Sequence, residues 1–172
     1  GFPAVGGYAS TYGGFYVLYG LGAALEFNLQ GGTTTLPTAN MTANNFAARL
    51  GGLTVTTAYP GATGIMGVGL YDMADTTEDG VFNFGDFAGP LGSPIATRNH
   101  NFSGAPADFD NIDVTAALRN DLFGAGQTNF SGFVLIPTDL SGQFQGVAYD
   151  ENTPTLTIYP PGVSPPPTGA GG

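Results

Sequence analysis

A run of oxygen-bearing side chains between residues 75 and 86 gives the clearest metal-binding pattern in this sequence. The side chains recur at the first, third, fifth, ninth and twelfth positions of a twelve-residue stretch, which is the spacing of a loop that wraps its oxygens around Ca²⁺. Gly80 stands at the sixth position, where such a loop turns sharply, and a main-chain carbonyl serves at the seventh. The predicted ligands are Asp75, Thr77, Asp79, Val81, Asn83 and Asp86.

Other features of the same run favour a plain acidic turn. Thr77 replaces the Asn or Asp that is usual at the third position, and Pro90 and Pro94 oppose the helix that normally follows such a loop. Asp79 and Gly80 also form a common turn dipeptide. A looser cation site would recruit other acids, and its candidate ligands are Asp72, Glu78 and Asp110.

Other residues that could bind a ligand or take part in a reaction form weaker patterns. Asp108, Asp110 and Asp113 form a second acidic cluster, in which Asp113 could cap a helix or the group could hold a cation. His100 is the only histidine, and its place between two asparagines predicts an ordinary surface residue. No Gly-x-Ser-x-Gly turn presents a serine nucleophile, and tryptophan is absent. We therefore expect no enzymatic activity.

The charge balance excludes several classes of partner. Thirteen acids stand against three arginines and no lysine, for a net charge of −10. Nucleic acids are bound by neutralising phosphates with Lys and Arg, and anionic membranes attract basic segments, so neither is expected. The most apolar run, 15–25, is too short and glycine-rich for membrane insertion. The absence of cysteine excludes disulfides and thiolate sites.

The elements that must position these residues are predicted to be strands. The chain holds 29 glycines and 13 prolines among many Thr, Tyr and Phe residues, a composition that favours strands and tight turns over helices. Residues 33–48 are expected to form a polar loop. Runs of alternating or continuous apolar residues predict strands at 23–30, 53–59, 65–71, 95–97, 133–137, 143–148 and 155–159.

One helix is predicted in the C-terminal third. Its apolar face is formed by residues at helical spacing, Val114, Ala117, Leu118 and Leu122. Asp113 is placed to cap its first turn, and Gly124 is expected to end it in the left-handed conformation. The prediction is therefore an all-β, jelly-roll-type sandwich with one short helix and extended terminal segments.

Several segments resemble one family of exported bacterial domains. "IDVTAAL", "NFSGFVLIP" and "TPTLTIYPP" are similar to the closing half of the DNRLRE-type, or carbohydrate-binding-module-like, domain of surface proteins with PEP-CTERM sorting tails. "AALEFNLQ" resembles its opening strand, although Glu26 or an apolar residue stands where the family has Arg, and "LYDMADTTEDGVFNFGDF" resembles its acidic loop, which is also dockerin-like. The resemblance implies a jelly-roll sandwich outside the cell and no particular chemistry.

The chain divides into three parts on composition. Residues 1–22 are a glycine-rich and aromatic extension, 23–160 are the sandwich domain, and 161–172 are a Pro/Gly-rich tail. The extension is either an ordinary first strand or a strand donated to a neighbouring copy through main-chain pairing. The residues expected at that interface are Phe15, Tyr16, Val17, Leu18 and Tyr19.

Low charge and the unusual extension favour a structural role. We expect a subunit of an extracellular filament or surface layer, present as a mature form after signal-peptide removal and assembled into a homopolymer by strand complementation. The alternative is a secreted carbohydrate-binding or adhesion module, which would make glycans its partners. Three sequons predict possible glycosylation in a secreted protein, at Asn40, Asn101 and Asn129.

Overall fold

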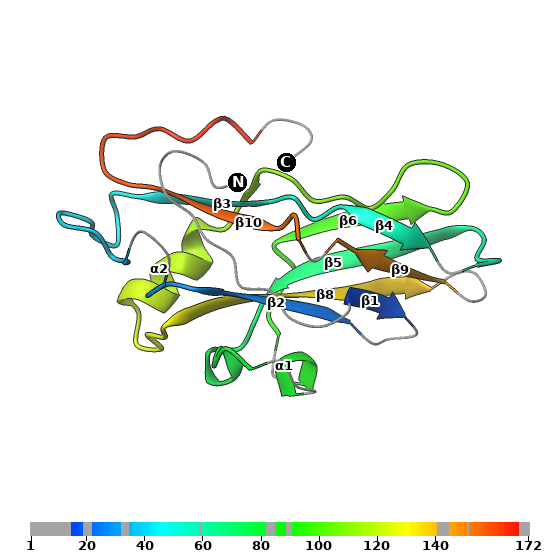
Figure 1. The fold of residues 1–172 in the computed structure, drawn as a ribbon, viewed down its shortest axis with the longest axis horizontal. Coiled ribbons are helices and arrows are strands. Elements are labelled where there is room, and N and C mark those ends of the chain that lie inside the picture. Colours follow the sequence, from blue (N-terminus) through cyan, green and yellow to red (C-terminus); the bar gives the residue numbers. More distant parts are fainter. Residues whose placement is uncertain are drawn as a thin grey trace.

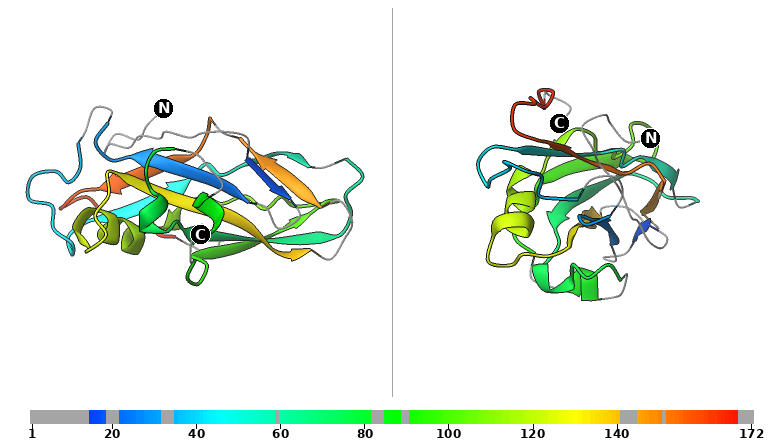
Figure 2. Two further views of the ribbon diagram at one scale, coloured as in Figure 1. Left: turned by 90° about the horizontal axis from the view of Figure 1, so that it is seen from below. Right: turned by 60° about the vertical axis from the view of Figure 1, so that its left-hand side comes forward.

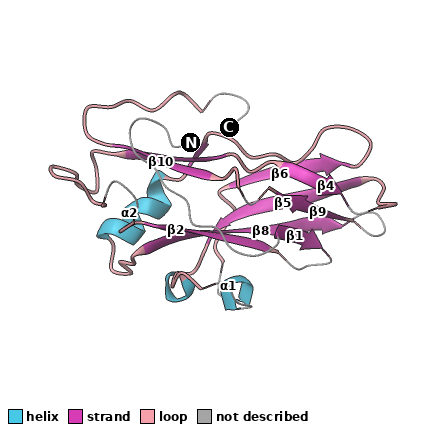
Figure 3. Cartoon of the chain, viewed as in Figure 1, coloured by secondary structure: helices cyan, strands magenta, loops and turns pink. Residues whose placement is uncertain are grey.

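The computed structural model describes residues 15–18, 22–31, 35–58, 60–81, 85–88, 91–140, 145–150 and 152–168. Strands dominate these residues (Figure 3). The strands are β1 (Phe15–Leu18), β2 (Ala23–Asn28), β3 (Ala47–Gly51), β4 (Val55–Ala58), β5 (Ile65–Asp72), β6 (Ala96–Asn101), β7 (Ile112–Asp113), β8 (Phe130–Leu140), β9 (Gly146–Tyr149) and β10 (Thr155–Tyr159). The helical elements are the 3-10 turn η1 (Asp75–Thr77), the short α1 (Gly85–Ala88) and the nine-residue α2 (Thr115–Phe123).

The strands form the predicted all-β sandwich. One layer is a four-stranded antiparallel sheet in the order β2-β8-β5-β6. The opposite layer holds two three-stranded sheets, in the orders β10-β3-β7 and β1-β9-β4. Figure 1 shows β3 and β10 lying above β2 and β8, with α2 at one end of the sandwich.

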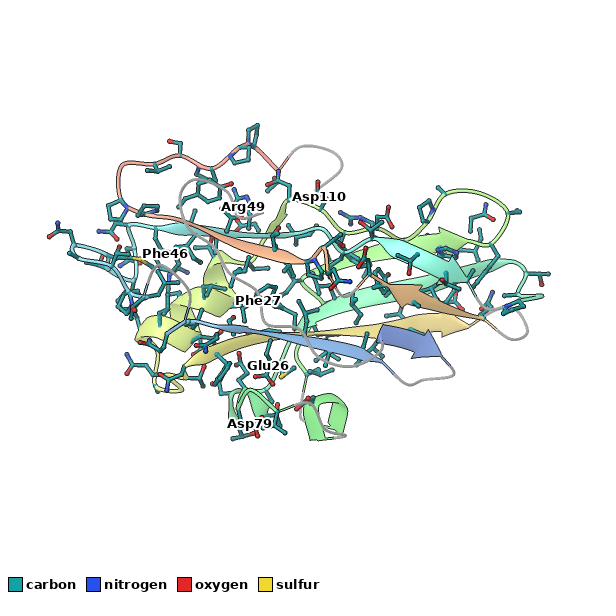
Figure 4. The ribbon with its side chains drawn as sticks, in the orientation of Figure 1. Glu26, Phe27, Phe46, Arg49, Asp79 and Asp110 are labelled. Atoms are coloured by element: carbon teal, nitrogen blue, oxygen red, sulfur yellow. The ribbon has the colours of Figure 1, made fainter. Side chains whose placement is uncertain are left out.

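The core fills the space between the layers. Strand alternation explains why: in β2, Ala23, Leu25 and Phe27 belong to the main apolar cluster, while Glu26 lies on the other face. The Phe27 ring meets Phe133 of β8 edge-on, with the ring centroids 6.3 Å apart. The interior position of Phe27 is visible in Figure 4. Both faces of β2 are therefore buried, one in the core and one under the acidic loop.

The chain changes layers between β1 and β2. β1 pairs antiparallel with β9, from Phe15 opposite Tyr149 to Leu18 opposite Gly146. β2 pairs with β8 in the other layer, beginning with Ala23 opposite Leu135. Four residues, 19–22, connect the two strands. The predicted extension therefore supplies an edge strand to one sheet, whereas β2, the next strand in the sequence, belongs to another.

Helix α2 forms where it was predicted, but both of its ends differ from the prediction. Its N-cap is Val114, which makes no side-chain capping hydrogen bond, and Asp113 precedes the cap and accepts the amide of Thr115 at 3.0 Å. Gly124 is extended, with φ −82° and ψ −179°, so the expected left-handed stop is wrong. Its amide bonds Asn120 O at 2.9 Å. A Cβ on Gly124 would lie 2.5 Å from Asn120 Oδ1, so close approach accounts for this glycine.

Strand β3 was expected to begin as loop, and that expectation is wrong. It starts at Ala47 and lies between β10 and β7. Ala48 and Leu50 are buried, whereas Arg49 points away and forms an ion pair with Asp113 at 3.1 Å. Arg49, in the middle of the strand, obscures the alternation in the sequence. The structure explains its charge, because Asp113 of the neighbouring strand β7 forms an ion pair with it.

The tail crosses the outer side of β3 and β10 (Figure 1). Asn111 Nδ2 donates to the carbonyl of Pro167 at 2.8 Å, which fastens the described part of the tail to the body of the same chain. No helix among the described residues is long and apolar enough to cross a membrane.

Candidate metal centre

The acidic loop after β5 lies on the outer face of the four-stranded sheet. Its short helical elements, η1 and α1, lie below β2 and β8 in Figure 1 and stand in front of them when the molecule is viewed from that side (Figure 2). Glu26 and Asp79 point toward each other on this side, away from the core (Figure 4). The loop brings carboxyl groups into two separate clusters.

The first group, the β2–α1 cluster, consists of Glu26, Asp79 and Asp86. One oxygen of each lies within 4.8 Å of those of the others. Glu26 and Asp86 are fully buried, and Asp79 is exposed. Glu26 Oε2 accepts the amide of Gly80 at 2.7 Å, which ties the tip of the loop to β2. Gly80 has φ +80°, a conformation that favours glycine.

The second group, the β5–α2 cluster, consists of Asp72, Glu78 and Asp121. Their oxygens also lie within 4.8 Å of one another. Asp72 is the last residue of β5, Glu78 follows η1, and Asp121 projects from α2. Glu78 and Asp121 are buried, with exposed fractions of 4% and 0%. Three elements distant in sequence therefore bring three acids to one place.

Two hydrogen bonds orient the β5–α2 cluster. Glu78 Oε2 accepts the amide of Gly132 in β8 at 2.5 Å, and the carbonyl of the same glycine accepts the amide of Met73, just after the end of β5. Asp121 Oδ2 accepts the hydroxyl of Ser131 at 2.6 Å. A Cβ on Gly132 would come within 2.6 Å of Met73 Sδ, so a larger residue here would displace the Met73 side chain.

Burial controls the ionisation of the β5–α2 cluster. Burial raises the pKa of Glu78 strongly, and the charge of Asp121 adds to this effect. Burial also raises the pKa of Asp121, with a further increase from the charge of Asp72. For Asp72, burial and the charge of Asp75 raise the pKa to about 6. Such groups either retain protons or require a positive partner.

The structure divides the predicted calcium ligands between different surroundings. Asp79 and Asp86 meet in the β2–α1 cluster, together with Glu26, which was not predicted as a ligand. Asp75 lies apart from that cluster, and both its oxygens accept Asn120 Nδ2, at 2.9 and 3.0 Å. The remaining ligands are placed as follows: Thr77 donates its hydroxyl to Ala74 O at 2.8 Å, Val81 is exposed, and Asn83 falls outside the described residues.

Sequence reasoning missed Glu26 and Asp121 as partners of the loop, although both carry a signal. Asp121 stands three residues after Leu118 and four after Ala117, which puts an acid on the predicted apolar face of α2. Glu26 interrupts an apolar run in β2. A carboxylate at a position that periodicity marks as buried indicates a partner or a ligand.

The second acidic run does not gather into a cluster. Asp108 Oδ1 accepts the amide of Val55 at 2.8 Å, and Asp110 Oδ1 accepts that of Gly52 at 3.3 Å. Asp113 binds Arg49. Each carboxylate therefore fastens this stretch to a different point of the segment that runs from β3 into β4.

His100 is buried in β6, contrary to the expected surface position. Its exposed fraction is 6%, and it stands opposite Met66 in β5. The amide of Ala107 donates to Nδ1 at 3.2 Å, and the ring of Phe102 packs edge-on at 4.6 Å. The pairing with β5 extends β6 beyond the three residues predicted from sequence.

We expect the pKa of His100 to lie below its usual 6.5, because burial disfavours the charged ring although Asp108 opposes this effect. A lowered pKa means that the contribution of His100 to stability is lost as the pH falls below 6.5. An NMR titration of the single histidine measures this, with the chain in urea as the reference. A folded pKa equal to or above the urea value would contradict the prediction.

The sequons occupy different settings. Asn40 and Asn129 are exposed, and Asn40 has φ +66° in a turn. Asn101 is partly buried at the end of β6, where its Oδ1 accepts the amide and hydroxyl of Ser103, both at 3.0 Å. Glycosylation at these three positions remains a prediction.

Comparison with known proteins gives no family for this chain: no family model matches the sequence, and no curated protein does. The resemblance to DNRLRE-type domains therefore stays a prediction.

Proposed function

We propose that this protein is a structural subunit of an extracellular filament or surface layer, in which neighbouring copies exchange strand β1. The observation that carries the proposal is the position of β1. It is an edge strand near the start of the chain, and among the described strands it pairs with β9 alone. A strand held in this way can be supplied by another copy with the same main-chain pairing.

The connection to β2 favours exchange. Residues 19–22 link two strands that belong to different layers. A short connection between two strands promotes domain swapping, because exchange of the strand between copies removes the need for the connection to turn back onto its own chain. If β1 swings outward, β9 becomes an open edge that accepts the β1 of the next copy.

The composition agrees with such packing. Charged residues form 9% of the chain, well below the roughly 25% of ordinary soluble domains. Contact surfaces between subunits are depleted of charge and enriched in aromatic residues. The predicted interface residues Phe15–Leu18 make up β1, and Tyr19 lies outside the described residues.

Deleting residues 1–22 is the direct test. The full chain is expected to form filaments or sheets visible by electron microscopy, and the truncated chain is expected to stay monomeric by sedimentation. A synthetic 1–22 peptide should bind the truncated chain, because it restores the partner of β9. Assembly of the truncated chain would contradict the proposal, as would a full chain that stays monomeric and binds polysaccharides in a glycan array.

Two neighbouring proline substitutions provide a matched control. In an antiparallel pair, successive residues of an edge strand point their amides alternately toward the partner and away from it. One of Tyr16→Pro and Val17→Pro therefore removes a donor to β9, and the other removes an amide that faces outward. Unequal loss of assembly between the two variants is expected. Equal, full assembly by both variants would argue against pairing through β1.

A further inference from the structure

The β5–α2 cluster has the dimensions of a cation site. Two oxygens bound to one Ca²⁺ at ~2.4 Å can be at most ~4.8 Å apart. The oxygens of Asp72, Glu78 and Asp121 satisfy this limit. The three carboxylates each bring one oxygen to the site, and water molecules can complete the six to eight oxygens that Ca²⁺ takes in flexible geometry.

Two buried oxygens in the cluster lack a hydrogen-bond donor. They are Glu78 Oε1 and Asp121 Oδ1, on side chains that are 4% and 0% exposed. The second oxygen of each group is held by Gly132 and Ser131, so both carboxyls are fixed in orientation. When one of the two groups keeps a proton, the carboxyls can share it. When both are ionised, a cation between them satisfies the two remaining oxygens.

The surrounding charges favour a cation over an arginine partner. The charges that act on this cluster come from other carboxyls, including Asp75. The three arginines make contacts elsewhere: Arg49 binds Asp113, Arg98 lies over the Phe109 ring, and Arg119 donates to Ala43 O. The donor set is entirely oxygen, which suits a hard ion.

Two surface hollows lie beside the cluster. One, of about 640 Å³, includes Glu78 and Asp121 in its lining. The other, of about 540 Å³, includes Asp72 and Asp75. Each of the three acids therefore lines a hollow that opens to solvent.

We propose that Asp72, Glu78 and Asp121 bind one Ca²⁺, which fastens the acidic loop and α2 to the end of β5. This site replaces the ligand set read from loop spacing, because Glu78 is not one of those predicted ligands and Asp79 belongs to the other cluster. The proposal does not depend on filament assembly, since every ligand comes from a single copy.

The test is thermal unfolding of the full chain in chelator and in Ca²⁺. At Ca²⁺ about one hundred-fold above its Kd, the Tm should rise by about 5–10 °C. Asp121→Asn should lose this rise, while Asp79→Asn, in the β2–α1 cluster, should keep it. Isothermal titration should give one bound Ca²⁺ per chain for Asp79→Asn and no detectable binding at this site for Asp121→Asn.

The loss of the Ca²⁺ effect in the Asp121 variant can be distinguished from a failure of that variant to fold. Asn at position 121 can still accept the Ser131 hydroxyl, and it removes a buried charge, so in chelator this variant should melt no lower than the unaltered chain. Glu78→Gln provides a second variant with the same expected loss. The proposal is overturned if Ca²⁺ leaves the Tm of the unaltered chain unchanged, if Glu78→Gln keeps the rise, or if Asp79→Asn alone abolishes it.

Discussion

In chelator, the free energy of unfolding is expected to fall as the pH is raised from about 4 to about 8, by on the order of a few kcal/mol. Burial raises the pKa of Glu78 and Asp121, and it raises that of Asp72 to about 6. The folded chain therefore keeps protons that the unfolded chain has already released. Stability is greatest below the unfolded pKa values and decreases as the pH passes through the folded ones.

Glu78→Gln isolates this effect. Glutamine is neutral throughout the range and can still accept the Gly132 amide through its carbonyl oxygen, so this variant should show a much flatter fall. Asp79→Asn is the control, because it changes the neighbouring, exposed acid and should leave the slope unaltered. Urea unfolding at a series of pH values measures all three proteins. Equal slopes for Glu78→Gln and the unaltered chain would contradict the assignment.

Phe27→Ala is expected to reduce the free energy of unfolding by about 3–5 kcal/mol. Phe27 is fully buried in β2, and its ring meets Phe133 edge-on. Truncation removes this contact and leaves a cavity between the two layers, where Leu25 and Leu135 are also fully buried. A loss of this size is a large share of the roughly 5–15 kcal/mol that stabilises a domain.

Ile65→Ala is the matched control for the core variant. Ile65 begins β5 and is 48% exposed, so its truncation should change stability by no more than about 0.5 kcal/mol. Denaturant titration of both variants gives the comparison. A loss below about 1 kcal/mol for Phe27→Ala would mean that the layers can close around the missing ring.

The sequence by itself determined the features that depend on neighbouring residues. Alternation predicted β10 at 155–159, and helical spacing predicted α2 within one residue of its start. Such patterns are local, because the direction of a side chain follows from the backbone period. Strands β5 and β8 were also predicted, although β8 extends farther at both ends than the apolar run 133–137. Pairing with β2 and β5 supports those additional residues.

Only the tertiary structure decided which of these elements meet. Glu78 and Asp79 are adjacent in sequence, yet they belong to different clusters, because one faces Gly132 in β8 and the other lies near Glu26 in β2. The hydrogen bonds Glu78–Gly132 and Glu26–Gly80 each join residues 54 positions apart. The spacing of residues within one loop carries no information about hydrogen-bond partners this far away in the sequence. The layer change between β1 and β2 has the same cause, since the choice of sheet is made by distant strands, β9 and β8.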